Sequence, residues 1–295
     1  MMKTAYTTAQ CLEAFCAQMN AKAVEMGMQH SQFNDPAGAN NVSTARDMMR
    51  CLLMASGYEA LYDIWNRDSY TIKIQGPEAR DFPVKSSVTA SDDSHFLSEY
   101  YPIMGGKTGT HMSKEIFNLV TLVEIPGTDD WLACAVLYAQ QSNGNPNNRF
   151  VAAKQAVDAA LMKYRDPSAA HSGTEVCAAG VAVCKVPKHN PRAYALLDIP
   201  MLFEKNADEA KEPKSTTKIL TAMLALDYIP DLYTKMTVTQ DDIDAMPGRL
   251  YDGEFKAGDV ITVKDAIFAM LLPSSNTAAF VLGRFVGQRI MEING

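Results

Sequence analysis

The sequence lacks the residue patterns that hold metal ions in proteins. Its six cysteines form no C-x-x-C pair, and its five histidines show neither an H-E-x-x-H segment nor a zinc-finger spacing. A zinc enzyme is therefore not expected, and the sequence predicts no cofactor. Cys177 and Cys184 flank the segment AAGVAV, which leaves two alternatives, a disulfide across a hairpin or two free thiols.

A basic excess and long apolar segments are missing as well. Lysine and arginine number 27 against 34 aspartates and glutamates, for a net charge of −7, whereas nucleic-acid binders usually carry a basic excess. The apolar stretch 266–283 is interrupted by Pro-Ser-Ser-Asn, so we expect a buried pair of helices rather than a membrane span. Because MMKTAYTTAQCLEAFC has no apolar core, it is not a secretory signal. The chain is expected either to stay inside the cell or to be made with a leader that this sequence does not include.

What remains is the composition of an ordinary globular chain. Hydrophobic residues make up 47% and charged residues 21% of its 295 residues, a length that suits one large domain or two small ones. Helical spacing predicts helices over 12–26, 43–56, 150–164, 215–226 and 262–272, and another from about 276. Apolar runs predict a hairpin of strands at 116–125 and 131–139, a strand pair at 193–199 and 201–206, and short strands and loops over 70–104.

Ser215-Thr216-Thr217-Lys218 is the first of three motifs that can carry chemistry. Side chains three residues apart share one face of a helix, and the N-terminus of a helix favours developing negative charge. A serine hydroxyl becomes a nucleophile when a base takes its proton, and a lysine whose pKa is lowered by burial can act as that base. The motif predicts that the two side chains lie within hydrogen-bond reach. Taken alone, it also suits a capped surface helix.

The second and third motifs are Ser274-Ser275-Asn276 and Lys107-Thr108-Gly109. The serine motif stands between two predicted helices, where a loop can present a hydroxyl and an amide to a cleft, although any helix connection uses such residues. Along a sheet edge, a lysine, a hydroxyl and a glycine suit a peptide that ends in a carboxylate, while a Gly-rich turn is the simpler interpretation. The glycine spacing excludes a phosphate-binding P-loop.

Together the three motifs form a set used by acyl-serine transferases. The chain resembles the serine-type D-Ala-D-Ala carboxypeptidases, the low-molecular-mass penicillin-binding proteins of peptidase family S11, in KSTTKILTAMLAL, ITVKDAIFAMLLPSSNTAA, FCAQMNAKAVEMGM, STARDM and GGKTGT. The resemblance covers nearly the whole chain except 166–190. It implies an α/β (α+β) fold like that of penicillin-binding proteins and serine β-lactamases, in which helices cover an antiparallel sheet and a helical lobe forms the other wall of the cleft.

The resemblance also implies an activity, the removal of the terminal D-Ala from peptidoglycan stem peptides, with inhibition by β-lactams. Ser215 would attack the penultimate carbonyl and form an acyl-enzyme, with neutral Lys218 as its general base. Ser274 would pass a proton to the departing amine, and Asn276 would hold the substrate amide. The same resemblance implies an extracytoplasmic location and a muropeptide substrate, with no nucleic-acid partner.

Substrate binding is implied for a second group of residues. Lys107 and Thr108 would engage the terminal carboxylate, and Gly109 would leave room for the ligand backbone. The N–H groups of Thr110 and of the nucleophile would form the oxyanion hole. Arg149 matches a family arginine that supports carboxylate recognition, the alternative being an exposed arginine at the start of a surface helix.

The order of the motifs differs from that of the family, in which S-x-x-K precedes S-x-N and K-T-G comes last. Here 1–165 resembles the second half of the family's catalytic domain and 191–295 the first half, joined by 166–190, which is predicted to be a linker with at most one short strand. The chain therefore resembles a circular permutant. Alternatively, two copies could build the site by domain swapping as a homodimer.

Smaller departures from the family concern Lys214, where a small residue is usual, Thr277, where Asp is common, and a short DIPMLFEKN turn that lacks a glycine. The alternatives in the same class are a D,D-endopeptidase and a β-lactamase, but no Glu-x-x-Leu-Asn segment supplies a base for deacylation. From another class, a non-catalytic module that binds the cell wall remains open. The presence of all the named side chains favours the enzyme.

Overall fold

An antiparallel five-stranded sheet and the helices around it make up this mixed α/β protein. The computed structural model describes residues 6–140, 148–168, 175–188, 199–247, 250 and 253–294. Within this part of the chain the strand order is β3 (Ile103–His111), β4 (Ile116–Glu124), β5 (Asp130–Ala139), β6 (Ala178–Pro187) and β7 (Met201–Lys205). The predicted antiparallel sheet covered by helices is thus confirmed, and β3 with its K-T-G motif lies at an edge.

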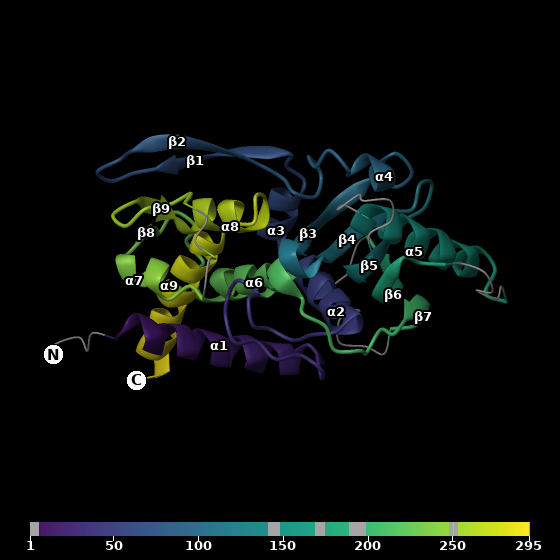
Figure 1. Cartoon of the computed structure of the whole chain (residues 1–295), viewed down its shortest axis with the longest axis horizontal. Coiled ribbons are helices and arrows are strands. Elements are labelled where there is room, and N and C mark those ends of the chain that lie inside the picture. Colours follow the sequence, from purple (N-terminus) through teal and green to yellow (C-terminus); the bar gives the residue numbers. More distant parts are fainter. Residues whose placement is uncertain are drawn as a thin grey trace.

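The apolar strands β4 and β5 lie in the middle of the sheet, where helices cover both faces and bury the side chains on each side. Helix α5 (Asn148–Arg165) packs on one face and α2 (Ala45–Ala55) on the other (Figure 1). Alternation along β4 sends Val120 and Leu122 into the core beneath α2, and Leu119 and Val123 into the core beneath α5. Full burial of each such side chain contributes about 1.5–3 kcal/mol, so the hairpin β4–β5 anchors both cores.

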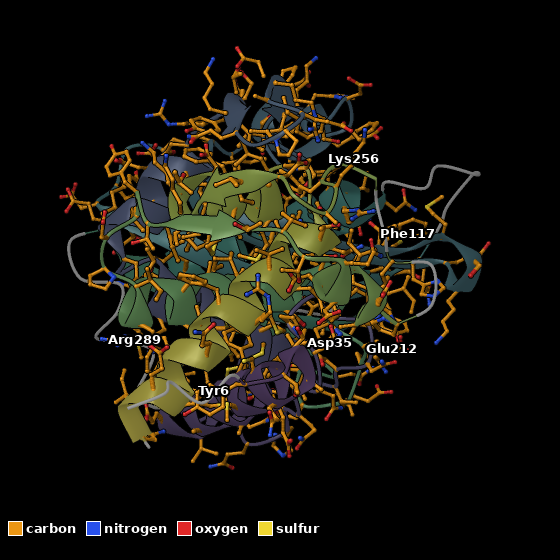
Figure 2. All side chains as sticks on the ribbon, turned by 90° about the vertical axis from the view of Figure 1, so that its left-hand side faces the viewer. Tyr6, Asp35, Phe117, Glu212, Lys256 and Arg289 are labelled. Carbon is orange, nitrogen blue, oxygen red and sulfur yellow. The ribbon has the colours of Figure 1, made fainter. Side chains whose placement is uncertain are left out.

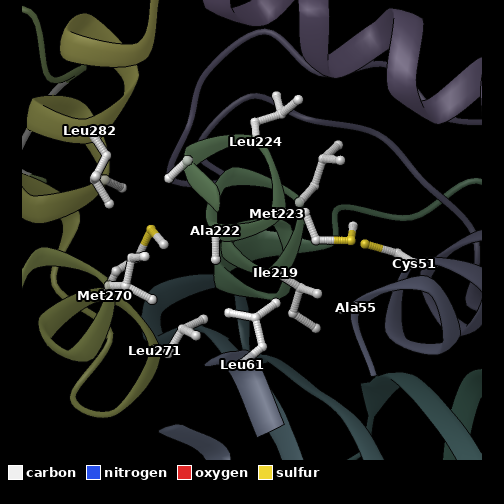
Figure 3. Close-up of a cluster of buried hydrophobic side chains, with 14 of the residues drawn as sticks. Cys51, Ala55, Leu61, Ile219, Ala222, Met223, Leu224, Met270, Leu271 and Leu282 are labelled. Atoms are coloured by element: carbon white, nitrogen blue, oxygen red, sulfur yellow. The ribbon is translucent and has the colours of Figure 1, made fainter. Parts of the chain in front are cut away.

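The helical lobe is built around α6 (Lys218–Tyr228), whose neighbours are α2, α1 (Thr8–Glu25), α8 (Val263–Leu271) and α9 (Asn276–Asn294). Figure 3 shows Ile219, Ala222 and Met223 of α6 surrounded by side chains from the neighbouring helices. Helices α1 and α9 approach very closely, because a Cβ added at Gly287 would lie 1.8 Å from the Cys11 carbonyl oxygen. The start of α1 and the end of α9 therefore lie together (Figure 1).

The remaining elements complete the described chain. They are α3 (Glu59–Trp65), the hairpin of β1 (Ser69–Ile74) and β2 (Arg80–Lys85), α4 (His95–Ser98), the 3-10 turn η1 (Met112–Lys114), β8 (Lys235–Thr237), α7 (Gln240–Asp244) and β9 (Val260–Thr262). The short strands expected between 70 and 104 are confirmed by β1 and β2. In the described chain, no helix combines the length and the hydropathy that crossing a membrane requires.

Threonine side chains cap the starts of α8 and α2, and only the first of these two caps is a full capping box. Thr262 and Asp265 form a full capping box at α8, in which each side chain bonds the backbone N–H of the other residue. At α2, Thr44 accepts the Asp47 N–H at 3.1 Å, but the reciprocal bond is missing. The Asp47 carboxylate instead accepts the Ser31 hydroxyl at 2.8 Å, because a buried carboxylate takes whichever donors the tertiary structure brings to it.

The structure differs from the prediction that 166–190 is a linker. Its residues 178–187 form β6, a ten-residue strand paired with β5 on one side and β7 on the other, and not a linker with one short strand. The partner of β7 is thus β6, whereas the predicted strand over 193–199 lies outside the described residues except for Ile199. The sequence did not predict this strand because AAGVAV contains few of the large β-branched and aromatic residues that are typical of strands.

The same strand decides between the two alternatives for Cys177 and Cys184. Both are free thiols. Seven residues of extended strand separate them by about 23 Å, while a disulfide needs Cα atoms within about 7 Å of each other. The segment between them runs straight and makes no hairpin turn, so a bond between these two cysteines is excluded.

Candidate active site

The S-x-x-K motif begins the central helix of the lobe. Ser215 lies in the 3-10 turn η3 (Lys214–Thr217), and Lys218 is the first residue of α6, three residues later than the helix start predicted from the sequence. The Lys218 Nζ atom is 2.8 Å from the Ser215 Oγ, as the spacing predicted. Lys218 is fully buried. Burial disfavours the charged form of an amine, which suits a proton acceptor.

The S-x-N motif reaches the same lysine from the loop between α8 and α9. Lys218 Nζ lies 2.7 Å from Asn276 Oδ1 and 3.4 Å from Ser274 Oγ. The other end of the Asn276 amide donates to the Leu250 carbonyl at 3.0 Å, which holds the amide in one orientation. Ser274 has φ +81°, a left-handed conformation that costs a non-glycine residue about 1 kcal/mol or more. The loop therefore holds the Ser274 hydroxyl at the lysine against local backbone preference.

Strand β3, which carries the K-T-G motif, lies on the other side of the site from the S-x-x-K and S-x-N motifs. Lys107 is fully buried and donates to the Thr108 carbonyl at 3.1 Å. Burial and the nearby positive charges of Lys218 and Arg149 hold the pKa of Lys107 well below its usual value. Gly109 allows this wall to approach the nucleophile, because a Cβ there would lie 2.7 Å from the Pro213 carbonyl. One chain thus brings the first and third motifs together.

Arg149 is a buried cation behind the K-T-G strand and not the exposed arginine of the alternative interpretation. It is only 4% exposed, and its Nη1 donates to the carbonyls of Gly109 and Asn118, each at 3.3 Å. Its Nε has no hydrogen-bond partner among the described residues, and its guanidinium lies over the Phe117 ring at 5.3 Å from the ring centre. Burial lowers the pKa of Arg149 to about 10. Within the described chain no carboxylate forms a direct ion pair with Arg149, and the negative charge of Asp93 only partly offsets the effect of burial on its pKa.

Two cavities meet at Thr110, which lines both. The Ser215 cavity has a volume of about 530 Å³ and is bordered by the 37–40 loop, Ser215, Asn276 and Leu250. The Arg149 cavity has a volume of about 470 Å³ and is bordered by Thr108, Arg149 and the 85–92 segment. Volumes of this size are typical of ligand sites. The cavity beside Ser215 and the cavity beside the buried guanidinium therefore adjoin at Thr110.

Asn118 is a buried polar residue that the sequence reasoning missed. Its Nδ2 donates to the carbonyls of Glu212 and Pro213 at 2.9 and 3.0 Å, and its Oδ1 accepts the Tyr138 N–H at 2.9 Å. It therefore ties β4 and β5 to the loop that carries the nucleophile. The signal was present in the sequence, since Asn118 is the one amide in the apolar strand IFNLVTLVEI.

The loop FNDPAGANN is the second feature that was missed, since the sequence identified it only as a loop. The Asp35 carboxylate accepts the N–H groups of four successive residues, 37–40, and so fixes the loop from inside. Gly38 then packs on the backbone of Lys214, where a Cβ would lie 1.9 Å from the carbonyl oxygen. In Figure 2, Asp35 and Glu212 occupy the same flank, although 177 positions separate them in sequence.

Comparison with known proteins agrees with part of this picture. Residues 185–288 match the peptidase S11 family of D-alanyl-D-alanine carboxypeptidases. The matched region contains Ser215, Lys218, Ser274 and Asn276, whereas Lys107 lies outside it. No curated protein and no solved structure matches the chain. The match supports a serine hydrolase with a domain like that of penicillin-binding proteins over this region.

Proposed function

We propose that this protein is a serine D,D-carboxypeptidase, which removes the terminal D-Ala of peptidoglycan stem peptides through an acyl-enzyme on Ser215. The observation that carries the proposal is the buried Lys218 amine, 2.8 Å from the Ser215 hydroxyl and bonded to both polar side chains of the S-x-N loop. A serine next to a buried amine that can take its proton is an activated nucleophile. The match over 185–288 supports the same reaction class.

Acylation then follows from the positions of three side chains. Lys218 takes the Ser215 proton while Ser215 Oγ forms a bond to the penultimate carbonyl carbon. As the C–N bond to the terminal D-Ala breaks, the proton returns from Lys218 through the Ser274 hydroxyl to the leaving amine. Water then hydrolyses the ester, with Lys218 again as the base.

Recognition of the terminal carboxylate is the proposed task of the sheet wall. The carboxylate would accept hydrogen bonds from the Thr108 hydroxyl and rest near two buried basic side chains, Lys107 and Arg149. Arg149 Nη1 donates to the carbonyl of Gly109 on β3 and to the carbonyl of Asn118 on β4. The two carbonyls therefore lie close together, and the backbone polar groups of Gly109 point toward β4. Strand alternation then turns the N–H of Thr110 to the open edge. We place the oxyanion between this N–H and that of Ser215, where each donor contributes about 3–4 kcal/mol in well-studied hydrolases.

The order of the motifs is part of the proposal. A penicillin-binding protein fold in circularly permuted order would need α1 to continue from α9 in space, and these two helices pack along each other with Cys11 against Gly287. A permutant should also bring Met1 near Gly295, and both of these residues lie outside the described part of the chain. By family resemblance, we also propose that the protein acts outside the cytoplasm.

Penicillin labelling tests the proposed reaction. A β-lactam presents a strained amide and a carboxylate, so intact mass spectrometry should detect one added drug mass that is absent in Ser215→Ala. The adduct should be long-lived, since none of the described residues that line the Ser215 cavity is a carboxylate able to serve as a deacylation base. Release of D-Ala from a D-Ala-D-Ala peptide is the matching activity assay. Rapid turnover of penicillin would indicate a β-lactamase, and neither adduct nor turnover would indicate a binding module.

One chain or two can build this site, and a mixing experiment separates the possibilities. We expect a monomer by light scattering, in which Ser215→Ala and Lys107→Ala variants do not restore activity when refolded together. The covalent connection favours assembly within one chain, since linked segments meet at effective concentrations in the millimolar range. Recovery of activity in the mixture would show that the halves of a swapped dimer complement each other.

A further inference from the structure

Ser87 is a polar residue of the Arg149 cavity that the proposed reaction does not use. It lies half-buried in the segment after β2 and lines this cavity together with Thr108. The Ser87 Oγ is 2.8 Å from the Thr108 Oγ1, and either hydroxyl could be the donor of this hydrogen bond. The hydroxyl that is proposed to bind the terminal carboxylate therefore has a hydroxyl partner of its own.

The backbone of the turn 86–89 directs the Ser87 side chain toward Thr108. The Ser87 N–H donates to the Leu272 carbonyl at 2.9 Å. The Ser86 hydroxyl accepts the N–H groups of the last two residues of the turn at 3.2 and 3.1 Å. None of these three bonds involves the Ser87 Oγ, so we expect the turn to keep its shape when that hydroxyl is removed.

The same residue connects two of the three motifs. Leu272 ends α8 two positions before Ser274, so the backbone of Ser87 bonds the chain that leads into the S-x-N loop. Its side chain bonds the K-T-G strand at Thr108. Ser87 is therefore placed to hold the Thr108 hydroxyl in a fixed position relative to the S-x-N loop.

The direction of the bond between Ser87 and Thr108 decides what Thr108 can offer to an anion. A hydroxyl has one proton to donate and two lone pairs to accept with. If Thr108 donates to Ser87, only oxygen lone pairs face a carboxylate, which repels them. If Ser87 donates to Thr108, the Thr108 proton is available. Lys107 Nζ lies 3.5 Å from the same Thr108 oxygen as a second, weaker donor, which favours the arrangement in which that oxygen accepts.

We propose that Ser87 is a positioning residue for the terminal carboxylate: it donates to the Thr108 hydroxyl, which in turn donates to the carboxylate. This inference rests on the proposed function for the place of the carboxylate. A hydrogen bond to a charged acceptor is roughly twice as strong as a neutral one, so a bound carboxylate selects this direction. Each bond in such a chain polarises the next. Ser87 thus increases the preference for an anionic leaving group by acting through Thr108.

The test uses two thioesters of N-acetyl-D-Ala whose leaving thiols differ in one group. One thiol is mercaptoacetic acid, whose carboxylate stands in for that of the terminal D-Ala, and the other is mercaptoacetamide. Thiol release gives kcat/KM for each. We expect Ser87→Ala to lower the ratio of the acid value to the amide value by about threefold to tenfold, the size of one neutral hydrogen bond. The value for the amide should stay the same, because Thr108 meets no anion there.

A double-mutant cycle shows whether Ser87 acts through Thr108. Thr108→Val keeps the shape of the side chain and removes its hydroxyl, so the ratio should fall further than in Ser87→Ala. Adding Ser87→Ala to Thr108→Val should then change the ratio by less than about 1.5-fold, because the two residues are coupled. Equal effects of Ser87→Ala in the two backgrounds would overturn the positioning role.

Two control variants separate the hydroxyl from the fold. Ser87→Thr keeps a hydroxyl on the same carbon and should retain the ratio of the unmodified protein. Ser69→Ala makes the same deletion at an exposed position on β1 and should leave the ratio unchanged. If Ser87→Ala lowers kcat/KM for the acid and the amide equally, its role is only structural and the inference is overturned.

Failure of the inference can be told apart from failure of the proposed function. An unchanged ratio in Ser87→Ala, with normal turnover of both thioesters, would overturn the inference and leave the proposed function standing. Turnover of neither thioester by the unmodified protein would overturn the proposed function, and the inference with it.

Discussion

Each wall of the cleft contains a buried lysine, but the two lysines differ in their hydrogen-bond partners. On the helical wall, Lys218 contacts the serine, the second serine and the asparagine of its own constellation. On the sheet wall, the hydrogen bonds of the Lys107 amine to described residues go to Thr108 alone, and its neighbour Arg149 forms no direct ion pair within the described chain. The helical wall is therefore assembled before substrate arrives, whereas the sheet wall holds positive charge that an anion would complete.

This difference has a cost in stability. Uncompensated buried charge is strongly destabilising, while a satisfied polar network rigidifies the structure that surrounds it. The low pKa of Lys107 is one sign of this cost, and the unbonded Nε of Arg149 is another. Substitution of the lysine on the helical wall should thus lower the rate of the reaction. Substitution of the lysine on the sheet wall should lower activity and raise the free energy of unfolding.

The largest expected effect is that of Lys218→Met. Loss of the base should slow both penicillin acylation and D-Ala release by about 10²–10⁴-fold, as is typical of general-base removal, while the buried methionine keeps the volume filled. Stopped-flow acylation rates give the measurement. Lys73→Met serves as the control and should acylate at the normal rate. An unchanged rate in Lys218→Met would contradict the assigned role.

Asn118→Leu tests the connection between the two walls. It leaves the carbonyls of Glu212 and Pro213 and the N–H of Tyr138 without their partner. At about 1–3 kcal/mol for a buried unsatisfied group, we expect a loss of at least 2 kcal/mol in the free energy of unfolding, measured by urea denaturation. Asn66→Leu, at an exposed position, should change it by less than about 0.5 kcal/mol. Equal effects of the two variants would show that Asn118 does not hold the nucleophile loop.

Lys107→Met should have the opposite sign on stability. Removal of the buried amine should raise the free energy of unfolding by about 1–2 kcal/mol at pH 7, with loss of peptide hydrolysis. In the unmodified protein, stability should increase with pH between the low folded-state pKa of Lys107 and its unfolded value of 10.5, since only the unfolded state binds the proton there. The advantage of the variant should therefore shrink as the pH rises. A pH-independent difference would contradict this electrostatic cause.

The smallest expected effect is that of Ser274→Gly. Glycine adopts a φ of +81° without strain, so the free energy of unfolding should rise by up to about 1 kcal/mol. D-Ala release should slow, because the hydroxyl next to Lys218 is lost. Thermal unfolding together with the activity assay tests the pair of changes. A loss of stability would mean that the hydroxyl contributes more than the backbone strain costs.

Much of the helical wall could be predicted from the sequence. The spacing of Ser215 and Lys218 predicted their contact, and helical spacing predicted the helix that begins near Thr262. These features involve residues within a few positions of one another. Local backbone geometry decides such contacts, so residue type and spacing carry enough information to predict them.

The sheet wall depended on the tertiary structure. Neither the strand β6 nor the burial of Arg149 was evident from residue type, and the bonds of Asn118 to the nucleophile loop cross 94 and 95 positions of sequence. By itself the sequence determined which residues are candidates for the chemistry and the local geometry of the Ser215–Lys218 pair. Only the folded chain decided that Lys107 and Arg149 are buried and that Asn118 bonds the loop before Ser215, because strand register and packing between distant segments set those contacts.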